Sequence, residues 1–342
     1  MIDLSSDTAT RPTPEMRQFM AAAPVGDEQR REDPTVNELQ QMAAELTGKE
    51  AALFLPSGTM CNAIAFAVHC RPGDAVILDI GAHPNTAEAG GPAVIAGVLL
   101  RPLNGERGLF TPEQAAQLVT ARGTHITKTQ MISVENTTNR GGGKVWPVEF
   151  LAGLRKLVDA NDMKLHMDGA RLLNAVVASG VAAKEFACYT DSVWIDLSKG
   201  LGAPVGAVLA GSREFIEEAR FWKHRLGGAM RQAGIIAAAG VYAFKYHVDR
   251  LAEDHANAKL LEAGLKTIPN VKQINGPVET NILLFDVAGT GRSAAEIGKR
   301  LEERGVRMSI FGGTLIRAVT HLDVSRVNCE RAIDALREAC TS

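Results

Sequence analysis

The sequence predicts an α/β fold: a mostly parallel sheet sandwiched by helices, followed by a smaller C-terminal α+β domain. Short apolar runs that favour strands alternate with helical patterns over residues 1–245. Several of these runs are apolar without alternation, which is typical of strands covered on both faces. After about residue 245 the pattern changes to long polar-faced helices with fewer strands. We therefore expect a large domain over 1–245 and a small one over 246–342, and allow that the N-terminal segment packs on the small domain.

The individual elements follow from these patterns. Strand-favouring apolar runs of the large domain lie at 51–55, 75–79, 93–103, 130–136, 164–168, 192–197 and 205–211. Helical patterns lie between them at 60–70, at 111–121 with Thr111 as N-cap and Pro112 at the first helical position, and at 147–162. The smaller domain is expected to contain a helix over 246–266, the apolar run 279–287, a helix at 294–305, the run 315–325 and a final helix.

One segment, residues 232–244, is Ala-rich and apolar on every side. This pattern indicates a helix that is buried in the core or at a subunit interface. The run is uncharged and is too short to cross a bilayer.

Composition narrows the class of protein. The 342 residues carry a formal net charge of −2, which gives no electrostatic reason to expect nucleic acid or a membrane as partner. The N-terminal stretch has no apolar signal core. The five cysteines are scattered and form no CxxC pair, so neither a metal site nor a disulfide framework is predicted. We expect buried, reduced thiols in a cytoplasmic protein.

Ligands of open α/β sheets bind at the carboxyl ends of the strands, and two candidate segments follow strands in the first half of the chain. In "PSGTM" (56–60), the backbone N–H groups and the hydroxyls of Ser57 and Thr59 can hold a phosphate at a helix N-terminus; the alternative is a simple helix cap. In "GAHPN" (81–85), His83 follows the strand directly; the alternative is a hydrogen-bonded structural histidine.

Two further segments follow later strands. Asp168 ends a strand in "HMDGAR" (166–171), with Arg171 on the following turn, although an acid there could merely cap the next helix. Lys199 lies in "DLSKGLGAPVG" (196–206), between a strand and a glycine-rich loop, although most lysines are solvated surface charges. Asp168 and Lys199 are separated by one helix, so we expect them at neighbouring strand ends.

Together these residues suit pyridoxal phosphate. Its phosphate needs a helix N-terminus, its ring nitrogen needs a carboxylate that keeps it protonated, and its aldehyde needs a lysine for a Schiff base. His83 is a candidate to stack on the flat ring.

Many segments in order resemble the L-threonine aldolase and β-eliminating lyase family, within the aspartate-aminotransferase-like fold (fold type I). They include "DLSSDTATRPTPEM", "EDPTVNELQ", "LFLPSGTMCN", "VENTTNRGGG", "LHMDGARLLNA", "LSKGLGAPVGAVLAGS", "GGAMRQAG" and "IRAVTHLDVS". The resemblance runs nearly from end to end.

The resemblance implies a set of site residues. Cofactor contacts would come from Gly58, Thr59, His83, Asp168 and Lys199, with Lys199 forming the Schiff base and Asp168 pairing with the ring nitrogen. The substrate carboxylate would be held by Ser6, Arg171 and Arg317. Arg231 would reach the site of a neighbouring subunit, because active sites of this family lie between subunits, usually in homotetramers.

The family reaction cleaves the Cα–Cβ bond of a β-hydroxy-α-amino acid to glycine and an aldehyde. His83, directly or through water, is our candidate for the base that takes the β-hydroxyl proton. Two alternatives stay open. The same cofactor could support β-elimination, dehydration or racemisation, or the chain could be an inactive binding or scaffold protein on this fold.

Three segments depart from typical members. Arg30 and Arg31 in "EQRREDPTVN" stand where "DVYGEDPTVN" is usual, Asn85 in "HPNTAEAGG" stands in a normally aromatic run, and Thr138 in "ENTTN" replaces a histidine. We expect these residues to contact the substrate, although the two arginines could be surface charges. Added guanidinium groups and lost bulk then predict that threonine is a poor substrate and that a larger or anionic side chain is preferred.

Overall fold

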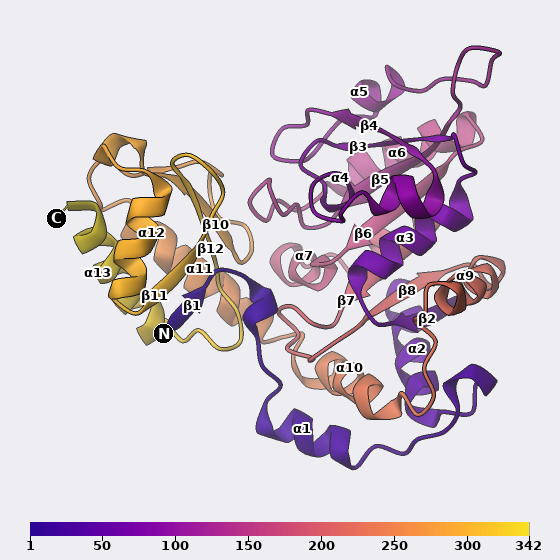
Figure 1. Ribbon diagram of the computed structural model, residues 1–342, viewed down its shortest axis with the longest axis horizontal. Helices are drawn as coiled ribbons and strands as arrows, with labels where there is room; N and C mark the ends of the chain where they lie inside the picture. Colours follow the sequence, from indigo (N-terminus) through magenta and orange to yellow (C-terminus); the bar gives the residue numbers. More distant parts are fainter. Residues whose placement is uncertain (342) are drawn as a thin grey trace.

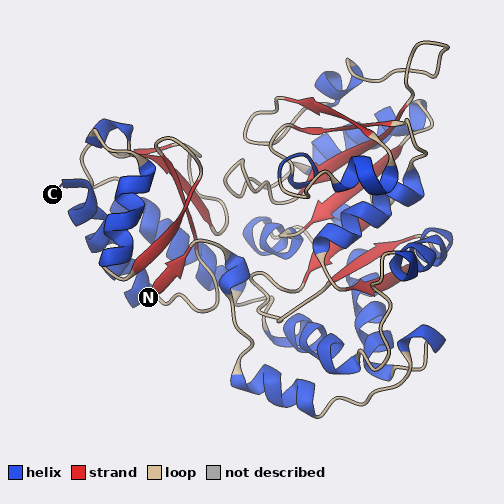
Figure 2. Cartoon of the chain, in the orientation of Figure 1, coloured by secondary structure: helices blue, strands red, loops and turns tan. Residues whose placement is uncertain are grey.

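The computed structural model describes residues 1–341, and they build two separate sheets, each with its own helices (Figures 1 and 2). The large sheet has seven strands: β2 (Ala51–Leu55), β3 (Ala75–Asp79), β4 (Leu99–Leu103), β5 (Thr129–Glu135), β6 (Lys164–Gly169), β7 (Ser192–Asp196) and β8 (Ala207–Gly211). Their order is β2-β8-β7-β6-β5-β3-β4. Only β8 runs antiparallel to its neighbours, β2 and β7. The mostly parallel α/β class is confirmed.

Helices cover both faces of this sheet, as the unbroken apolar runs predict. One face packs against α3 (Gly58–His69) and α9 (Arg213–Arg225). The other face packs against α2 (Pro34–Thr47), α6 (Val148–Ala160), α7 (Leu172–Ser179), α8 (Ala183–Ala187) and α10 (Gly234–Tyr246). Successive residues of β7 alternate between the faces: Val193 and Ile195 join the second cluster, and Trp194 joins the first.

Three predicted elements differ from the structure. The run 93–103 is not one strand, because residues Pro92–Ala96 form a helical turn, η3, that ends at Gly97 with φ +66°, and β4 begins only at Leu99. The helix capped by Thr111, α5 (Pro112–Ala116), is much shorter than predicted. The helix predicted over 246–266 is α11 (Leu251–Leu265), so it starts five residues later.

The small sheet has the order β1-β11-β12-β10-β9. Its strands are β1 (Ile2–Leu4), β9 (Lys272–Gln273), β10 (Ile282–Asp286), β11 (Val306–Ile310) and β12 (Leu315–Val319). It shares one apolar core with α11, α12 (Ala294–Glu303) and α13 (Arg326–Thr341). The N-terminal strand β1 pairs in parallel with β11, so the first residues of the chain belong to this sheet. Strand β1 and the last helix, α13, therefore both lie at this end of the molecule (Figure 1).

The apolar helix α10 is covered by its own chain. Ala237, Ala239 and Val241 are fully buried, and the helix packs between α1 (Pro14–Ala21) and α2. The core therefore accounts for most of its composition. Ile235 and Tyr246 at its ends are 49 and 61% exposed, so the subunit-interface setting stays a prediction.

The cysteines carry no disulfide. All five are free thiols; Cys61, Cys70, Cys329 and Cys340 are buried as predicted, but Cys188 is exposed. In the part of the chain that the structure describes, no helix combines the length and the apolar character needed to cross a membrane.

The two sheets are joined by a buried ion pair. Asp7, in the short helical turn η1 (Asp7–Ala9), accepts hydrogen bonds from Nε and Nη2 of Arg171, both at 2.7 Å. Asn281, which precedes β10 of the small sheet, donates to the same carboxylate at 3.1 Å. Burial alone would raise the pKa of Asp7, but the charge and hydrogen bonds of Arg171 outweigh it and hold that pKa below its ordinary value of 3.8.

We predict that Asp7→Asn lowers the free energy of unfolding by about 3 kcal/mol at pH 7, because it leaves the buried Arg171 without a counter-charge. The pKa of Asp7 is depressed in the folded state, so its stabilisation is complete above the unfolded value of 3.8 and declines as the pH falls below it. Urea unfolding of both proteins from pH 7 to pH 3 measures this, and the difference should shrink below about pH 4.

Asp3→Asn is the matched control for this prediction. Asp3 lies nearby on β1 but is only partly buried, and its ion-pair partner Arg307 is half exposed. The control should cost less than about 1 kcal/mol. Equal losses in the two variants, or a constant difference across pH, would contradict the role assigned to the Asp7–Arg171 pair.

Candidate active site

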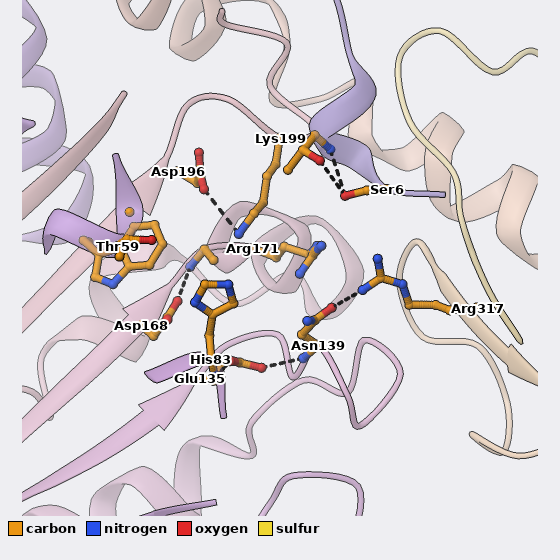
Figure 3. A pocket seen from close by; sticks show the side chains of 14 residues that line it. Ser6, Thr59, His83, Glu135, Asn139, Asp168, Arg171, Asp196, Lys199 and Arg317 are labelled. Atoms are coloured by element: carbon orange, nitrogen blue, oxygen red, sulfur yellow. Dashed lines mark hydrogen bonds and ion pairs between the residues drawn. The ribbon is translucent and has the colours of Figure 1, made fainter. Parts of the chain in front are cut away.

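A cavity of about 310 Å³ lies at the carboxyl ends of β5, β6 and β7 and is closed on one side by the small sheet. It is lined by eight of the residues predicted from the sequence: Ser6, Gly58, Thr59, His83, Asp168, Arg171, Lys199 and Arg317. Figure 3 shows Asp168, His83 and Lys199 on the large-sheet side and Arg317 entering from the small sheet. Residues far apart in the sequence therefore meet in one place.

Three predicted arginines lie elsewhere. The side chains of Arg30, Arg31 and Arg231 are 74, 56 and 62% exposed, and they pair with Asp27, Glu217 and Asp27 respectively. None of them lines the cavity of its own chain. The contact of Arg231 with a neighbouring subunit stays a prediction.

Three other predicted residues are also absent from the cavity wall. Ser57 is the N-cap of α3, and its hydroxyl accepts from the N–H of Met60. The Asn85 side chain donates to the carbonyl of Ile80. Thr138 accepts from the N–H of Lys144 and lines a separate small void beside Gly108. The expectation that these positions contact the substrate therefore has no support within the single chain.

Asp168 ends β6 and is buried at the base of the cavity. Its Oδ2 accepts from Asn62 Nδ2 at 2.9 Å, and its Oδ1 accepts from the N–H of Ala170 at 3.1 Å. It makes no ion pair with any residue between 1 and 341, and it does not cap α7, whose N-cap is Arg171. A buried carboxylate without a cation is costly, so the cavity is suited to a cationic group at this point.

Lys199 follows β7, and its side chain is only 16% exposed, so it is not a solvated surface lysine. Its Nζ lies 3.2 Å from Asp196 Oδ2 and 5.8 Å from the centre of the Trp194 ring. The backbone is also fixed, because the Thr10 hydroxyl donates to the Lys199 carbonyl at 2.9 Å. The amine is thus held inside the cavity beside an acid.

His83 begins the short helix α4 (His83–Thr86), and its Nδ1 lies 2.8 Å from Oε1 of the buried Glu88. This hydrogen bond raises the pKa of the imidazole. A carboxylate accepts, so Nδ1 carries the proton in the neutral ring and Nε2 keeps its lone pair. His83 can therefore act as a base through Nε2.

The two predicted carboxylate-binding arginines differ in how they are engaged. Arg171 gives two of its N–H groups to Asp7. Arg317 donates to Asn139 Oδ1 at 2.6 Å and to the Ser5 carbonyl at 2.9 Å, but its Nε has no partner. Among the described residues it makes no ion pair, and burial, together with Arg171, lowers its pKa to about 10. Arg317 is therefore the better placed of the two to receive an anion.

Six further residues of the cavity wall were not predicted from the sequence: Thr8, Glu135, Asn139, Ala170, Trp194 and Asp196. Glu135 ends β5, and its carboxylate accepts from the N–H groups of His83 at 2.8 Å and Asn139 at 2.5 Å. Burial, helped by the charge of Asp168, raises its pKa to about 7. The rule that singled out Asp168, an acid at a strand end, applies equally to Glu135 in "SVENTTN".

Gly58 and Trp194 shape the opposite wall. A Cβ atom on Gly58 would lie 2.3 Å from the Trp194 ring, so only glycine allows the start of α3 to approach β7 this closely. As a result, the first N–H groups of α3, which have no intrahelical acceptor, lie at the cavity. A helix N-terminus in this position favours an anion.

Comparisons with known proteins show the family of this chain. A low-specificity L-threonine aldolase of Escherichia coli (strain K12) is 44% identical over 332 residues, 95% of each chain, and a probable low-specificity L-threonine aldolase of Arabidopsis thaliana is 40% identical over 343 residues, 98% of this chain and 96% of the relative. The solved threonine aldolase of Leishmania major has the same fold, with a TM-score of 0.84 over the whole of both chains at 20% identity. The family model described as β-eliminating lyase matches residues 3–290, and the chain therefore belongs to the β-eliminating lyase family.

Proposed function

We propose that this protein is a pyridoxal-phosphate-dependent lyase that cleaves the Cα–Cβ bond of a β-hydroxy-α-amino acid to glycine and an aldehyde. The threonine aldolases that are 44 and 40% identical to it support this reaction. The observation that carries the proposal is the pattern of charge in one cavity. Asp168 is a carboxylate without a cation, Arg317 is a guanidinium without an anion, and the amine of Lys199 lies in the same space.

The residues present fit the cofactor. The free N–H groups at the start of α3, with the Thr59 hydroxyl, would hold the phosphate. Asp168 would receive the protonated ring nitrogen, which supplies the cation that the carboxylate lacks, and His83 lies in the same cavity to contact the ring. When bound, pyridoxal phosphate supplies an aldehyde that bonds to amines and a ring that accepts electrons from the substrate Cα.

The chain's own groups account for the rest of the reaction. Arg317, with Ser6, would bind the substrate carboxylate and so orient the bond that breaks. Nε2 of His83 would take the β-hydroxyl proton, because Glu88 holds the proton of the ring on Nδ1. Glu88 also stabilises the imidazolium that this transfer produces.

The departures from typical members do not reach this cavity, since Arg30, Arg31, Asn85 and Thr138 lie outside it. Within one chain they give no reason to expect poor cleavage of L-threonine. Arg231, Arg30 and Arg31 would bear on catalysis only in a cytoplasmic homotetramer with shared sites. Light scattering on the purified protein tests that assembly.

We predict that the purified protein binds pyridoxal phosphate through Lys199 and releases glycine and acetaldehyde from L-threonine. Borohydride reduction followed by peptide mapping should place the pyridoxyl group on Lys199, which is the lysine among the described residues of the cavity wall. Lys199→Ala should abolish cleavage. A label on another lysine, or a keto acid and ammonia as products, would contradict the proposal and favour β-elimination in the second case.

We predict that Arg317→Ala lowers kcat/KM for L-threonine by about 10- to 150-fold, the equivalent of losing charge-assisted hydrogen bonds of about 1.5–3 kcal/mol. Arg307→Ala, an exposed arginine on neighbouring β11, is the control and should change kcat/KM less than about twofold. If Arg317→Ala behaves like the control in steady-state kinetics, Arg317 does not bind the carboxylate.

We predict that Glu88→Gln moves the acidic limb of the kcat/KM–pH profile to lower pH. The Glu88 hydrogen bond raises the pKa of His83, and activity requires the unprotonated ring, so activity is lost as the pH falls through that pKa. Removing the charge lowers the pKa. Glu214→Gln, on the exposed side of α9, should leave the profile unchanged, and an unmoved limb in Glu88→Gln would exclude His83 as the titrating base.

A further inference from the structure

Asn62 lies behind the cavity and donates hydrogen bonds to two buried acids, Asp168 and Glu88. It is buried in the first turns of α3, and its Nδ2 lies 2.9 Å from Asp168 Oδ2 and 2.7 Å from Glu88 Oε1. Its Oδ1 lies 2.8 Å from Trp194 Nε1 and 3.1 Å from His166 Nε2. All four hydrogen-bonding positions of the amide are therefore used.

Chemistry fixes which way this amide points. The indole Nε1 of Trp194 can only donate, so the atom facing it must be the carbonyl Oδ1. The NH₂ group then faces Asp168 and Glu88, and each of its two hydrogens meets one carboxylate. The reverse orientation would bring an oxygen against two acids and an N–H against an N–H. An amide is the side-chain group that can accept twice and donate twice at one position.

The donor and acceptor roles of the next side chains, which lie further from the cavity, follow in the same way. Because Asn62 Oδ1 accepts, His166 Nε2 must carry a proton, and burial lowers the pKa of His166 to about 3, so its ring is neutral and Nδ1 accepts. Ser192 Oγ, 2.8 Å from Nδ1, therefore donates its one hydrogen there. His69 Nε2, 2.8 Å from the same oxygen, must then donate to it. His69 is also neutral, since burial lowers its pKa to about 4.

We propose that Asn62 is a positioning residue that holds Asp168 and, through Glu88, His83 in one arrangement, and that the buried series His69, Ser192 and His166 in turn fixes Asn62. Every hydrogen of this series has one place, so the carboxylate that faces the ring nitrogen and the imidazole that faces the substrate are oriented by the same amide. This inference rests on the proposed function, because it concerns how the cofactor's acid and the candidate base are held.

The arrangement has a consequence for the two acids. Asp168 and Glu88 share one donor group, and its two hydrogens offset the repulsion between neighbouring buried carboxylates. If Asn62 lost its fixed orientation, both acids would lose a hydrogen bond at once. A defect in the series should therefore weaken cofactor binding and turnover together and should leave Arg317, on the other side of the cavity, unaffected.

The first test reads hydrogen positions directly in the unaltered protein. Neutron diffraction from deuterium-exchanged crystals of the cofactor-loaded protein at pH 7 should show deuterium on Nε2 of His166 and His69 and none on Nδ1 of His166. It should also show both Asn62 deuterons directed at Asp168 and Glu88. Deuterium on His166 Nδ1, or a reversed Asn62 amide, overturns the proposal.

The second test compares two variants at one position. His166→Gln places an amide N–H₂ near the former Nε2 and keeps the bond to Asn62, whereas His166→Leu removes it at similar volume. We expect His166→Leu to raise the dissociation constant of pyridoxal phosphate and to lower kcat at least tenfold, with KM for L-threonine within threefold of the unaltered enzyme. His166→Gln should stay within threefold on all three measures.

Each possible result of the variant comparison leads to a different conclusion. Equal behaviour of the Leu and Gln variants, whether both are active or both impaired, overturns the proposal, because packing alone would then account for His166. Asn257→Leu, a half-buried amide with one backbone partner in the small domain, is the control for loss of an amide and should match the unaltered protein. If His166→Leu does not fold, Ser192→Ala replaces it, with the same expected direction. If the protein binds no pyridoxal phosphate, the proposed function fails, and a neutron map of the cofactor-free protein still decides the orientation of Asn62.

Discussion

The buried pair of Asp7 and Arg171 is the interaction on which the rest of the architecture depends. It ties the N-terminal segment to the large sheet, while Asn281 ties the same carboxylate to the small sheet. Thr10, three residues further on, donates to the backbone carbonyls of both Asp7 and Lys199. One short segment therefore joins the two sheets, places Ser6 and Thr8 in the cavity wall, and fixes the backbone of Lys199. An ion pair buried this completely contributes more by fixing the positions of the groups around it than by adding to net stability.

Charge in the cavity is separated in space. The acids Asp168 and Glu135 belong to the large-sheet side, and the unpaired guanidinium of Arg317 enters from the small sheet. Proximity of the acids has an electrostatic effect, because burial and the charge of Asp168 raise the pKa of Glu135 to about 7. A ligand that carries a cationic ring nitrogen at one end and an anionic carboxylate at the other would neutralise the charges of Asp168 and Arg317 together. The position of the small sheet is thus part of the binding chemistry.

The sequence predicted the residues of the cavity well where they lie at or after the ends of strands. Asp168 lies at the end of a strand, and Gly58, His83 and Lys199 follow strands within a few residues, so the sheet order brings them together by a general rule. It could not predict that Asp7 would occupy Arg171, because that contact joins residues 164 positions apart and depends on how two domains dock. It could not predict that Arg30, Arg31, Asn85 and Thr138 lie outside the cavity of their own chain, because a departure in a motif does not reveal the direction of a side chain. Strand β1 was missed because three residues carry almost no periodicity.

The position of β1 has a consequence for how the site comes into being. Asp3 pairs with Arg307, 304 residues later, so the small sheet stays incomplete until nearly the whole chain has left the ribosome. The large sheet, whose strands lie between residues 51 and 211, has no such requirement. During synthesis, the segment that carries Asp168 and Lys199 would therefore be assembled first, and strand β1 would stay unpaired until its partner strand is made. The enclosed cavity is the last feature to form, so a truncated chain would carry the chemistry without the enclosure.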